Sequence, residues 1–325
     1  MATKILTLLL GLVPSLASAA PFTNPLSPLI AKQPYVIYAD GYWYYMYTSH
    51  WEIEIARAPT LDGLKGGGQR KTIFPKLGDD RNFYNPRLYK FDDVWWLYYR
   101  ATPDTTIQRW GDKDFYVIKG GAKVTDTFSN PVKIANATTG QILQIHDQLY
   151  FLNDCGNDIC IASVSSPTSI GTSSVLAVSD QKWEYVGGNG RSIGNPTPFY
   201  HNDKTFIAYE LDFGAMFVEH PFGLLTYKGS GDPMLSSSWS KSGPFRNVAY
   251  RNGTSTCYSE LGNFFVSPDG LELWTLYNTD NLSKGCASPQ HTGAKRLDWN
   301  PDGSPNFSVP GVVEHAVDGP SGERT

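Results

Sequence analysis

Four carboxylates lie near the ends of segments that are rich in strand-forming residues. They are Asp154, Glu210, Asp212 and Glu260. Two carboxylates that share one cleft can act as a general acid and a general base and so cleave a bond with water. The simpler interpretation is that these acids are solvated carboxylates of turns and rims, where charged residues are usually found. The fold decides between the two, because it determines which of the four acids meet.

The four cysteines predict disulfide bonds rather than a metal centre. They are Cys155, Cys160, Cys257 and Cys286. Their even number suits two disulfides, and the close pair Cys155 and Cys160 leaves Cys257 and Cys286 as the second bond, although the other connectivities stay open. The Cys-x-x-Cys and His-x-His spacings typical of metal centres do not accompany them. We therefore expect no metal and no other cofactor.

Five aromatic-rich hairpins recur along the chain and would have to position these side chains. They occupy 35–48, 87–100, 141–154, 197–210 and 263–278. Each has a turn dipeptide such as Asp40-Gly41 or Asn202-Asp203 between two strand-forming segments. Successive hairpins start about 50 to 65 residues apart, which suits blades of four strands that are stable only when stacked on their neighbours. We predict an all-β, five-bladed β-propeller that forms a single domain over 21–325; spacing alone also allows a β-sandwich.

The composition limits the partners of the protein. The chain of 325 residues is 41% hydrophobic and 18% charged, which predicts a folded globular protein. Its net charge of -4 argues against nucleic acid or an anionic membrane as the main partner, because both favour a basic surface. The aromatic run 42–47 suggests a sugar-stacking surface, but packing between blades is the better interpretation for most of it. We expect a monomer that binds a hydrophobic small molecule or a sugar.

The N-terminus resembles a secretory signal. Lys4 precedes the apolar run 5–13, and 17–19 supplies the small residues of a cleavage site, so we predict a signal peptide over 1–20. The run is shorter than the roughly 20 residues that a membrane-spanning helix requires. Four glycosylation sequons, at Asn136, Asn252, Asn281 and Asn306, fit surface loops of a secreted glycoprotein. We expect the protein to enter the secretory pathway and to be secreted.

Three parts of the chain resemble a known enzyme family. They are 33–64, 223–245, and 267–278 taken with 299–308. These stretches look like glycoside hydrolase family 43, whose members are five-bladed propellers that cleave arabinan and xylan side chains. The resemblance covers nearly the whole mature chain. It implies an inverting hydrolysis by a base, an acid and an orienting carboxylate, each on the inner strand of its own blade.

The residues that match the catalytic positions of the family are not carboxylates here. The base position reads Gln33, the orienting position Thr139 and the acid position Gly194. The axial histidine of the family falls on Leu261, and its Pro-Glu pair in the second blade becomes Pro86-Arg87. Loss of a general acid or base typically lowers the rate by about 10²- to 10⁴-fold. We therefore expect the inherited hydrolytic mechanism to be lost.

The substituted site suggests a different reaction as the main hypothesis. Arg87 and Gln33 would be the catalytic residues, because a fixed cation and an amide can stabilise negative charge that develops on a substrate oxygen. The other candidate site residues are His50, Trp51, Tyr84, Asn85, Trp110, Thr139, Asn195 and Leu261. Such a site is similar in character to the fungal hetero-Diels–Alderases of tropolone sesquiterpenoid pathways. The hypothesis is an intermolecular cyclisation that joins a polyketide-derived quinone methide to a terpene.

Three alternatives stay open. Arg87 is equally well explained as part of a buried structural ion pair. The protein could be a carbohydrate-binding pseudoenzyme that has kept the pocket and lost the chemistry. It could also be a secreted arabinofuranosidase or xylosidase of the family 43 type, whose carboxylates have been relocated to the four acids near the strand ends.

Overall fold

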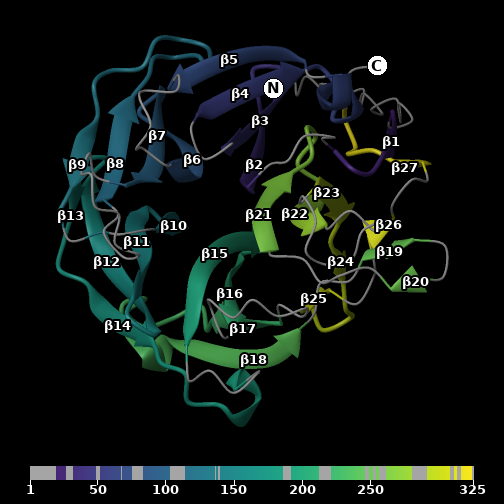
Figure 1. The fold of residues 1–325 in the computed structure, drawn as a ribbon. Helices are drawn as coiled ribbons and strands as arrows, with labels where there is room; N and C mark the ends of the chain where they lie inside the picture. The colour runs from purple at the N-terminus through teal and green to yellow at the C-terminus, as the bar shows by residue number, and fades with distance from the viewer. Residues whose placement is uncertain are drawn as a thin grey trace, which may run out of the picture.

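The computed structural model is a β-propeller of five blades, as Figure 1 shows. It describes residues 20–26, 32–48, 52–66, 68–74, 83–102, 114–135, 137, 140–185, 192–211, 221–245, 249–251, 254–255, 261–279, 291–307, 311–312 and 316–323. These residues form strands and three short 3-10 helices, with no α-helix among them. The all-β class and the five-bladed propeller are thereby confirmed. The domain limits 21–325 stay a prediction.

Blades 1 to 4 each contain at least four antiparallel strands. Blade 1 comprises β2 (Lys32–Ala39), β3 (Tyr42–Thr48), β4 (Ile53–Ala58) and β5 (Gln69–Phe74), and blade 2 comprises β6 (Phe83–Phe91), β7 (Val94–Ala101), β8 (Asp114–Lys119) and β9 (Val132–Ile134). Blade 3 comprises β10 (Gln141–Ile145), β11 (Gln148–Cys155), β12 (Asp158–Ser166), β13 (Ser169–Ile170) and β14 (Ser174–Ala177), and blade 4 comprises β15 (Ile193–His201), β16 (Lys204–Leu211), β17 (Phe222–Tyr227) and β18 (Trp239–Phe245). Consecutive strands pair in blades 1, 2 and 4, so each of these is a simple meander, whereas in blade 3 both β13 and β14 pair with β12.

Blade 5 and the chain ends complete the ring. Blade 5 comprises β21 (Leu261–Val266), β22 (Leu273–Thr279) and β23 (His291–Arg296). The remaining strands are short: β1 (Pro21–Thr23) with β27 (Ala316–Asp318), β24 (Asp298–Trp299) with β25 (Pro305–Asn306), and β19 (Ala249–Arg251) with β20 (Thr254–Ser255) and β26 (Gly311–Val312). The 3-10 helices are η1 (Asp62–Gly66), η2 (Lys182–Glu184) and η3 (Ser236–Ser238). The β1–β27 pair joins segments from both ends of the chain.

All five predicted hairpins are present, and each provides the first two strands of a blade. At the bend of the first hairpin Asp40 and Gly41 have φ of 52° and 82°, and at the fourth Asn202 and Asp203 have φ of 46° and 60°. These left-handed conformations suit the twist of tight hairpins, which explains why the bends use Asp, Asn and Gly. The first strands, β2, β6, β10, β15 and β21, surround the axis (Figure 1).

The aromatic run of β3 packs against both neighbouring blades. Trp43, Tyr45 and Tyr47 belong to the core shared with Phe265 and Trp274 of blade 5. Tyr44 and Met46 alternate with them along the strand and face the core shared with blade 2. Trp43, Tyr44, Tyr45 and Tyr47 are all buried. The packing interpretation therefore holds for these four aromatic residues, which are not available as a sugar-stacking surface, whereas Tyr42 is exposed.

Several sequence predictions fall outside the described residues. The predicted signal peptide covers 1–20, of which only Ala20 is described, so it stays a prediction. Among the sequons, Asn136, Asn252 and Asn281 are outside, whereas Asn306 lies in the two-residue strand β25 rather than in a loop, with partial exposure. No helix within the described ranges is long and apolar enough to cross a membrane.

Candidate active site

Four of the five inner strands contain a register shift near their first residues. The shifts lie between Lys32 and Tyr35, Tyr84 and Arg87, Gly194 and Thr197, and Leu261 and Phe264. In the same order, the residues inside these shifts include Pro34, Pro86, Pro196 and Gly262. Proline has no N–H to give to the ladder, and bulges next to active sites redirect side chains. Asn85 and Asn195, which precede two of these prolines, have left-handed φ values of 49° and 51°.

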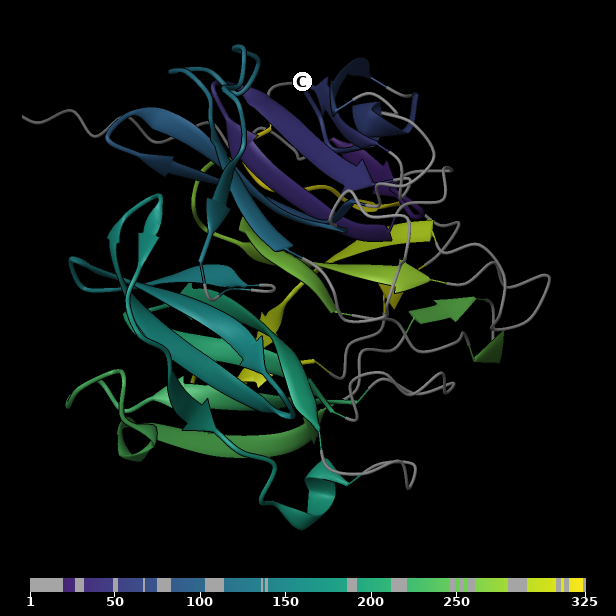
Figure 2. The ribbon, with the colours of Figure 1, turned by 60° about the vertical axis from the view of Figure 1, so that its left-hand side comes forward.

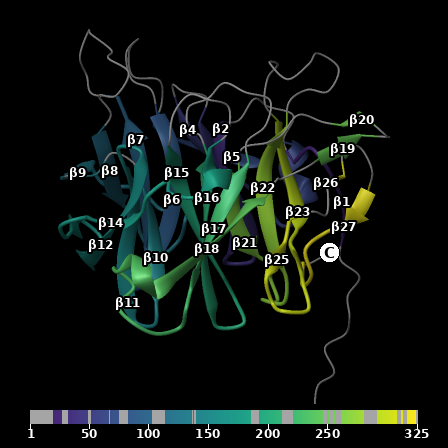
Figure 3. The ribbon, with the colours of Figure 1, turned by 90° about the horizontal axis from the view of Figure 1, so that it is seen from below.

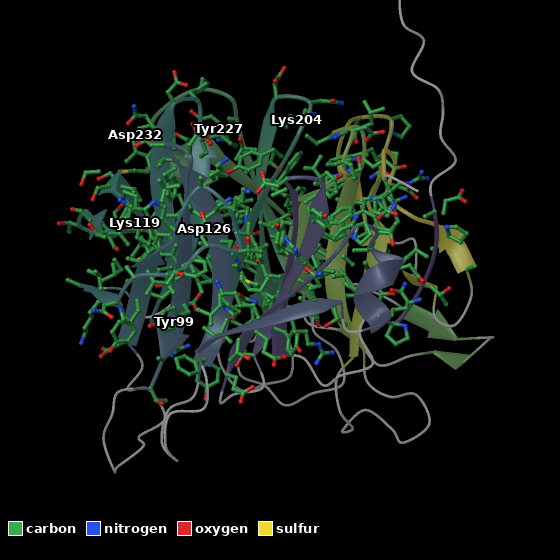
Figure 4. The ribbon with its side chains drawn as sticks, turned by 90° about the horizontal axis from the view of Figure 1, so that it is seen from above. Tyr99, Lys119, Asp126, Lys204, Tyr227 and Asp232 are labelled. Atoms are coloured by element: carbon green, nitrogen blue, oxygen red, sulfur yellow. A yellow bond between two sulfur atoms is a disulfide. The ribbon has the colours of Figure 1, made fainter. Side chains whose placement is uncertain are left out.

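These bulges all lie at one end of the propeller, which we call the mouth. Inner strands begin at the mouth, and the second strand of each hairpin runs back to it because the pairing is antiparallel. Figures 2 and 3 show the sheets edge-on, with their strands running from one end of the propeller to the other. In Figure 4, Tyr99, near the end of β7, lies toward the end of the propeller opposite Lys204 at the β15–β16 turn. The mouth therefore collects residues from the starts of β6 and β15 and from the ends of β7, β11 and β16.

Asn195 joins two carboxylates at the mouth. Its backbone N–H donates a hydrogen bond of 2.8 Å to Oδ1 of Asp154 on β11, and its side-chain Nδ2 donates one of 3.0 Å to Oε1 of Glu210 on β16. Glu210 is buried, with 7% of its surface exposed. Because blade 4 contacts β11 through β15, the two acids come from adjacent blades. A pair of acids in one cluster is the arrangement that acid–base catalysis requires.

The Asp154 carboxyl has a raised pKa. Burial raises it to about 6, and the hydrogen bond from the Asn195 N–H and the positive charge of Arg100 only partly offset that effect. Arg100 lies near the end of β7, and its Nε is buried without a hydrogen-bond partner in the described part of the chain. A carboxyl with a pKa near 6 holds a proton at mildly acidic pH, and the nearby guanidinium can stabilise the anion once that proton has left. Asp154 thus has the properties of a general acid.

Arg87 lies deeper than this pair. It follows the bulge of β6, is 3% exposed, and stacks its guanidinium over the ring of Tyr35 with 5.3 Å between Cζ and the ring centroid. Its Nη1 donates to the carbonyl of Pro86 at 3.0 Å. No carboxylate of the described residues pairs with it, so the alternative of a structural ion pair finds no partner there. Gln141 Nε2 donates to Thr197 Oγ1 at 3.0 Å, which links blades 3 and 4 at a similar depth.

Comparison with known proteins identifies the family. The family model for glycosyl hydrolases family 43 matches residues 22–305, which is most of the chain. The chain belongs to glycoside hydrolase family 43.

Curated family 43 relatives are longer than this chain. The chain is 26% identical over 316 residues to an extracellular exo-α-(1→5)-L-arabinofuranosidase of Streptomyces avermitilis. The aligned region covers 89% of this chain and 63% of that protein. It is 24% identical over 340 residues to α-L-arabinofuranosidase 43 of Humicola insolens, covering 95% of the chain and 67% of that protein. The chain thus spans about two thirds of the length of these relatives.

A solved family 43 structure has the same fold. The crystal structure of an α-L-arabinofuranosidase from Lactobacillus brevis superimposes with a TM-score of 0.73 at 23% identity, over 89% of this chain and 97% of that one. This likeness confirms the propeller fold. At this identity it does not extend to the chemistry.

In this family 43 protein, Glu210 lies across from the position at which the acid is expected. Gly194 and Glu210 are direct cross-strand partners in β15 and β16. Side chains of such a pair point to the same face of the sheet. Glu210 therefore presents a carboxylate on the face where the glycine leaves none. Asp154 has a comparable position on the second strand of blade 3, two residues along β11 from Leu152, the partner of Gln141.

The structure describes part of the predicted site. Tyr84, Asn85 and Asn195 lie at the mouth with partial exposure. Gln33 and Leu261 belong to β2 and β21, but their side chains are outside the description. His50, Trp51, Trp110, Thr139, Asp212 and Glu260 lie outside the described residues. The catalytic roles of Arg87 and Gln33 stay predictions.

Sequence reasoning missed Arg100 and the bridging role of Asn195. Arg100 pairs with Tyr84 in the β6–β7 ladder, so the residue was within reach as the cross-strand partner of a candidate. Its effect on Asp154 crosses from blade 2 to blade 3, and this proximity appears only when the blades are stacked. No local sequence pattern marks Arg100 as a residue of the site. The described residues contain no cluster of three or more potential metal ligands.

A disulfide closes the turn next to Asp154. Cys155 and Cys160 are bonded, as predicted, and connect the end of β11 to β12. Cys257 and Cys286 lie outside the described residues, so their pairing stays a prediction. The bonded ring is short, because the two cysteines are only five positions apart.

Removing this disulfide is expected to have a modest effect on stability. The Cys155→Ser/Cys160→Ser variant should lose roughly 2 kcal/mol of unfolding free energy, because a short ring restrains the unfolded chain less than a long one. Urea unfolding of the variant and of wild type under non-reducing conditions measures the difference. A loss above about 4 kcal/mol would contradict a purely local role.

Replacing Asp154 by asparagine is expected to stabilise the protein in a pH-dependent way. The folded-state pKa is raised, so the wild type loses stability as pH rises from the unfolded-state pKa near 4 to the folded-state value of about 6. The variant should match wild type near pH 3 and exceed it by at most about 3 kcal/mol above pH 6, since an amide still accepts the Asn195 N–H. Thermal unfolding at pH 4 and pH 7.5 tests this. Equal melting temperatures at pH 7.5 would exclude a raised pKa.

Proposed function

We propose that the protein is a glycoside hydrolase that cleaves arabinofuranosyl or xylosyl units from glycans, with Asp154 and Glu210 as relocated catalytic carboxylates. The observation that carries the proposal is the hydrogen-bonded unit Asp154–Asn195–Glu210 at the mouth. Family membership and the similarity to two arabinofuranosidases support the sugar class.

Asp154 would act as the general acid. Its pKa of about 6 keeps a substantial protonated fraction at mildly acidic pH, so it can protonate the glycosidic oxygen as the bond to the anomeric carbon breaks. The conjugate base would be stabilised by the Asn195 N–H and by the charge of Arg100. The acid would therefore lose its proton in the transition state at a moderate cost.

Glu210 would act as the second carboxylate. It would take a proton from the attacking water while the water oxygen bonds to the anomeric carbon, so that the products are a free pentose and the leaving alcohol. Asn195 Nδ2 holds one Glu210 oxygen, and this hydrogen bond would orient the group. Asn195 would be the positioning residue for both acids, because its backbone binds one and its side chain the other.

This hypothesis agrees with the relatives better than the cyclisation hypothesis does. The hetero-Diels–Alder reaction has no support from the family model or from the two curated relatives, which are arabinofuranosidases. The extracellular Streptomyces relative agrees with secretion of this chain, which we also propose. The proposed partner is a sugar substrate bound by a monomer.

Product analysis tests the function. Wild type should release pentose from an aryl α-L-arabinofuranoside or an aryl β-D-xyloside, and Glu210→Gln should reduce the rate by about 10²-fold or more. Asp203→Asn is the matched control, because Asp203 is an exposed carboxylate at the opposite end of the same hairpin and its left-handed φ suits asparagine. Binding of arabino-oligosaccharides without any pentose release would instead favour the carbohydrate-binding pseudoenzyme. Conversion of a polyketide-derived quinone methide and a terpene to a cyclised adduct would favour the cyclase.

A further inference from the structure

Arg87 carries a buried positive charge that the described residues do not neutralise. Its side chain is 3% exposed, and its Nε is buried without a hydrogen-bond partner. Its one hydrogen bond within the described residues goes from Nη1 to the carbonyl of Pro86. The titratable side chains close enough to affect it are the phenols of Tyr89 and Tyr35, which are neutral, and no carboxylate is among them.

Such a charge is costly. An isolated ion in a protein interior is strongly disfavoured, and buried ions are normally paired. Arginine does not escape the cost by losing its proton, because its pKa is too high, even though burial lowers the pKa of Arg87 from its ordinary value. Stacking on the Tyr35 ring compensates only in part, since a cation–π contact is weak compared with the cost of burying an unpaired charge. A negative partner next to the guanidinium would therefore be strongly favoured.

Tyr89 offers a second donor on the same side. It follows Arg87 by two positions on β6, so both side chains extend from the same face of the strand. The Tyr89 hydroxyl accepts the N–H of Ile142, and its own proton is left to donate. Burial raises the Tyr89 pKa to about 12, so the hydroxyl stays protonated at neutral pH. By contrast, the Tyr35 hydroxyl already donates to the carbonyl of Leu88 at 2.8 Å.

The geometry points to an anion-binding site inside the propeller, at which the guanidinium of Arg87 and the hydroxyl of Tyr89 hold a small monovalent anion such as chloride. The near-complete burial of Arg87 excludes a bulky ligand. The site is distinct from the carboxylates at the mouth, because Arg87 is three positions further along β6 than Tyr84 and pairs with Tyr98 rather than with Arg100. Bound anion would stabilise the packing of the inner strands.

Thermal unfolding in different salts tests the site. Wild type should show a saturable rise in melting temperature of roughly 5 °C between 0 and 100 mM sodium chloride, relative to sodium gluconate at equal ionic strength. Arg87→Gln should lose this chloride-specific rise. Arg57→Gln is the matched control and should keep it, because Arg57 lies on the outer strands of blade 1 and bonds to Gln69. Equal curves in the two salts for wild type would overturn the site.

A second measurement covers the case in which Arg87→Gln does not fold. Tyr89→Phe keeps the Arg87 guanidinium but removes the hydroxyl donor. This variant should therefore need about tenfold more chloride than wild type for the same rise in melting temperature. Crystals of wild type grown or soaked in sodium bromide should show an anomalous peak in contact with Arg87. Absence of that peak, with bromide ordered elsewhere, would show that the charge is not neutralised by a free anion.

Discussion

Asp154→Asn is expected to lower kcat for a phenyl arabinofuranoside by roughly 10²- to 10⁴-fold. The amide keeps the oxygen that accepts the Asn195 N–H but cannot donate a proton to the leaving oxygen. The loss should depend on the leaving group. A dinitrophenolate leaves without protonation, so the dinitrophenyl arabinofuranoside should lose much less rate than the phenyl one. Steady-state kinetics with both substrates measures the difference.

The control for this variant is Asp147→Asn, at the exposed turn of the β10–β11 hairpin. It should retain wild-type kinetics, because this carboxylate lies at the opposite end of blade 3 from Asp154. An equal loss of rate for the two leaving groups in Asp154→Asn would assign the residue a role other than that of the acid.

Glu184→Ala is expected to lower the unfolding free energy by about 3–5 kcal/mol. Glu184 is fully buried and accepts four hydrogen bonds: Oε1 accepts from Tyr209 Oη at 2.7 Å and Lys241 Nζ at 2.8 Å, and Oε2 accepts from two backbone N–H groups at 2.8 Å each. Truncation leaves these donors without their acceptor. Denaturant unfolding measures the loss.

Asp180→Ala provides the matched comparison. Asp180 binds the same Lys241 Nζ at 2.9 Å but is 55% exposed, so its loss should cost less than about 1 kcal/mol. Similar losses for the two variants would show that burial does not determine the strength of the Glu184 interactions. Because Tyr209 is adjacent to Glu210 in β16, Glu184→Ala should also disturb the carboxylate pair.

The repeat made the fold predictable. In the first hairpin, for example, the left-handed turn Asp40-Gly41 precedes β3, which is buried on both alternating faces after Tyr42, and these are local properties of the chain. The bond between Cys155 and Cys160 was predictable for the same reason, since a separation of five positions leaves little choice of partner.

The candidate site was only partly predictable. Glu210 and Asp154 were identified as acids near strand ends, but the burial of Glu210 and the raised pKa of Asp154 arise from the stacking of blades 2, 3 and 4. Aligning the first strands with the family placed Gly194 at the position of the general acid, which indicated that this carboxylate is lost. The compensating carboxylate on β16 becomes evident only with the register that pairs Gly194 with Glu210. The bridging by Asn195 depends on its left-handed backbone, which no sequence pattern indicated.

The most direct test of relocated acid–base hydrolysis is the pH dependence of kcat/KM for pentose release from an aryl α-L-arabinofuranoside. For wild type the rate is expected to fall as pH rises through about 6, because the acid must be protonated to donate. Asp154→Asn should lack this fall and retain only a low rate across the range. Pentose release that is unchanged between pH 5 and pH 8, or no release above buffer at any pH, would contradict hydrolysis through Asp154 and Glu210.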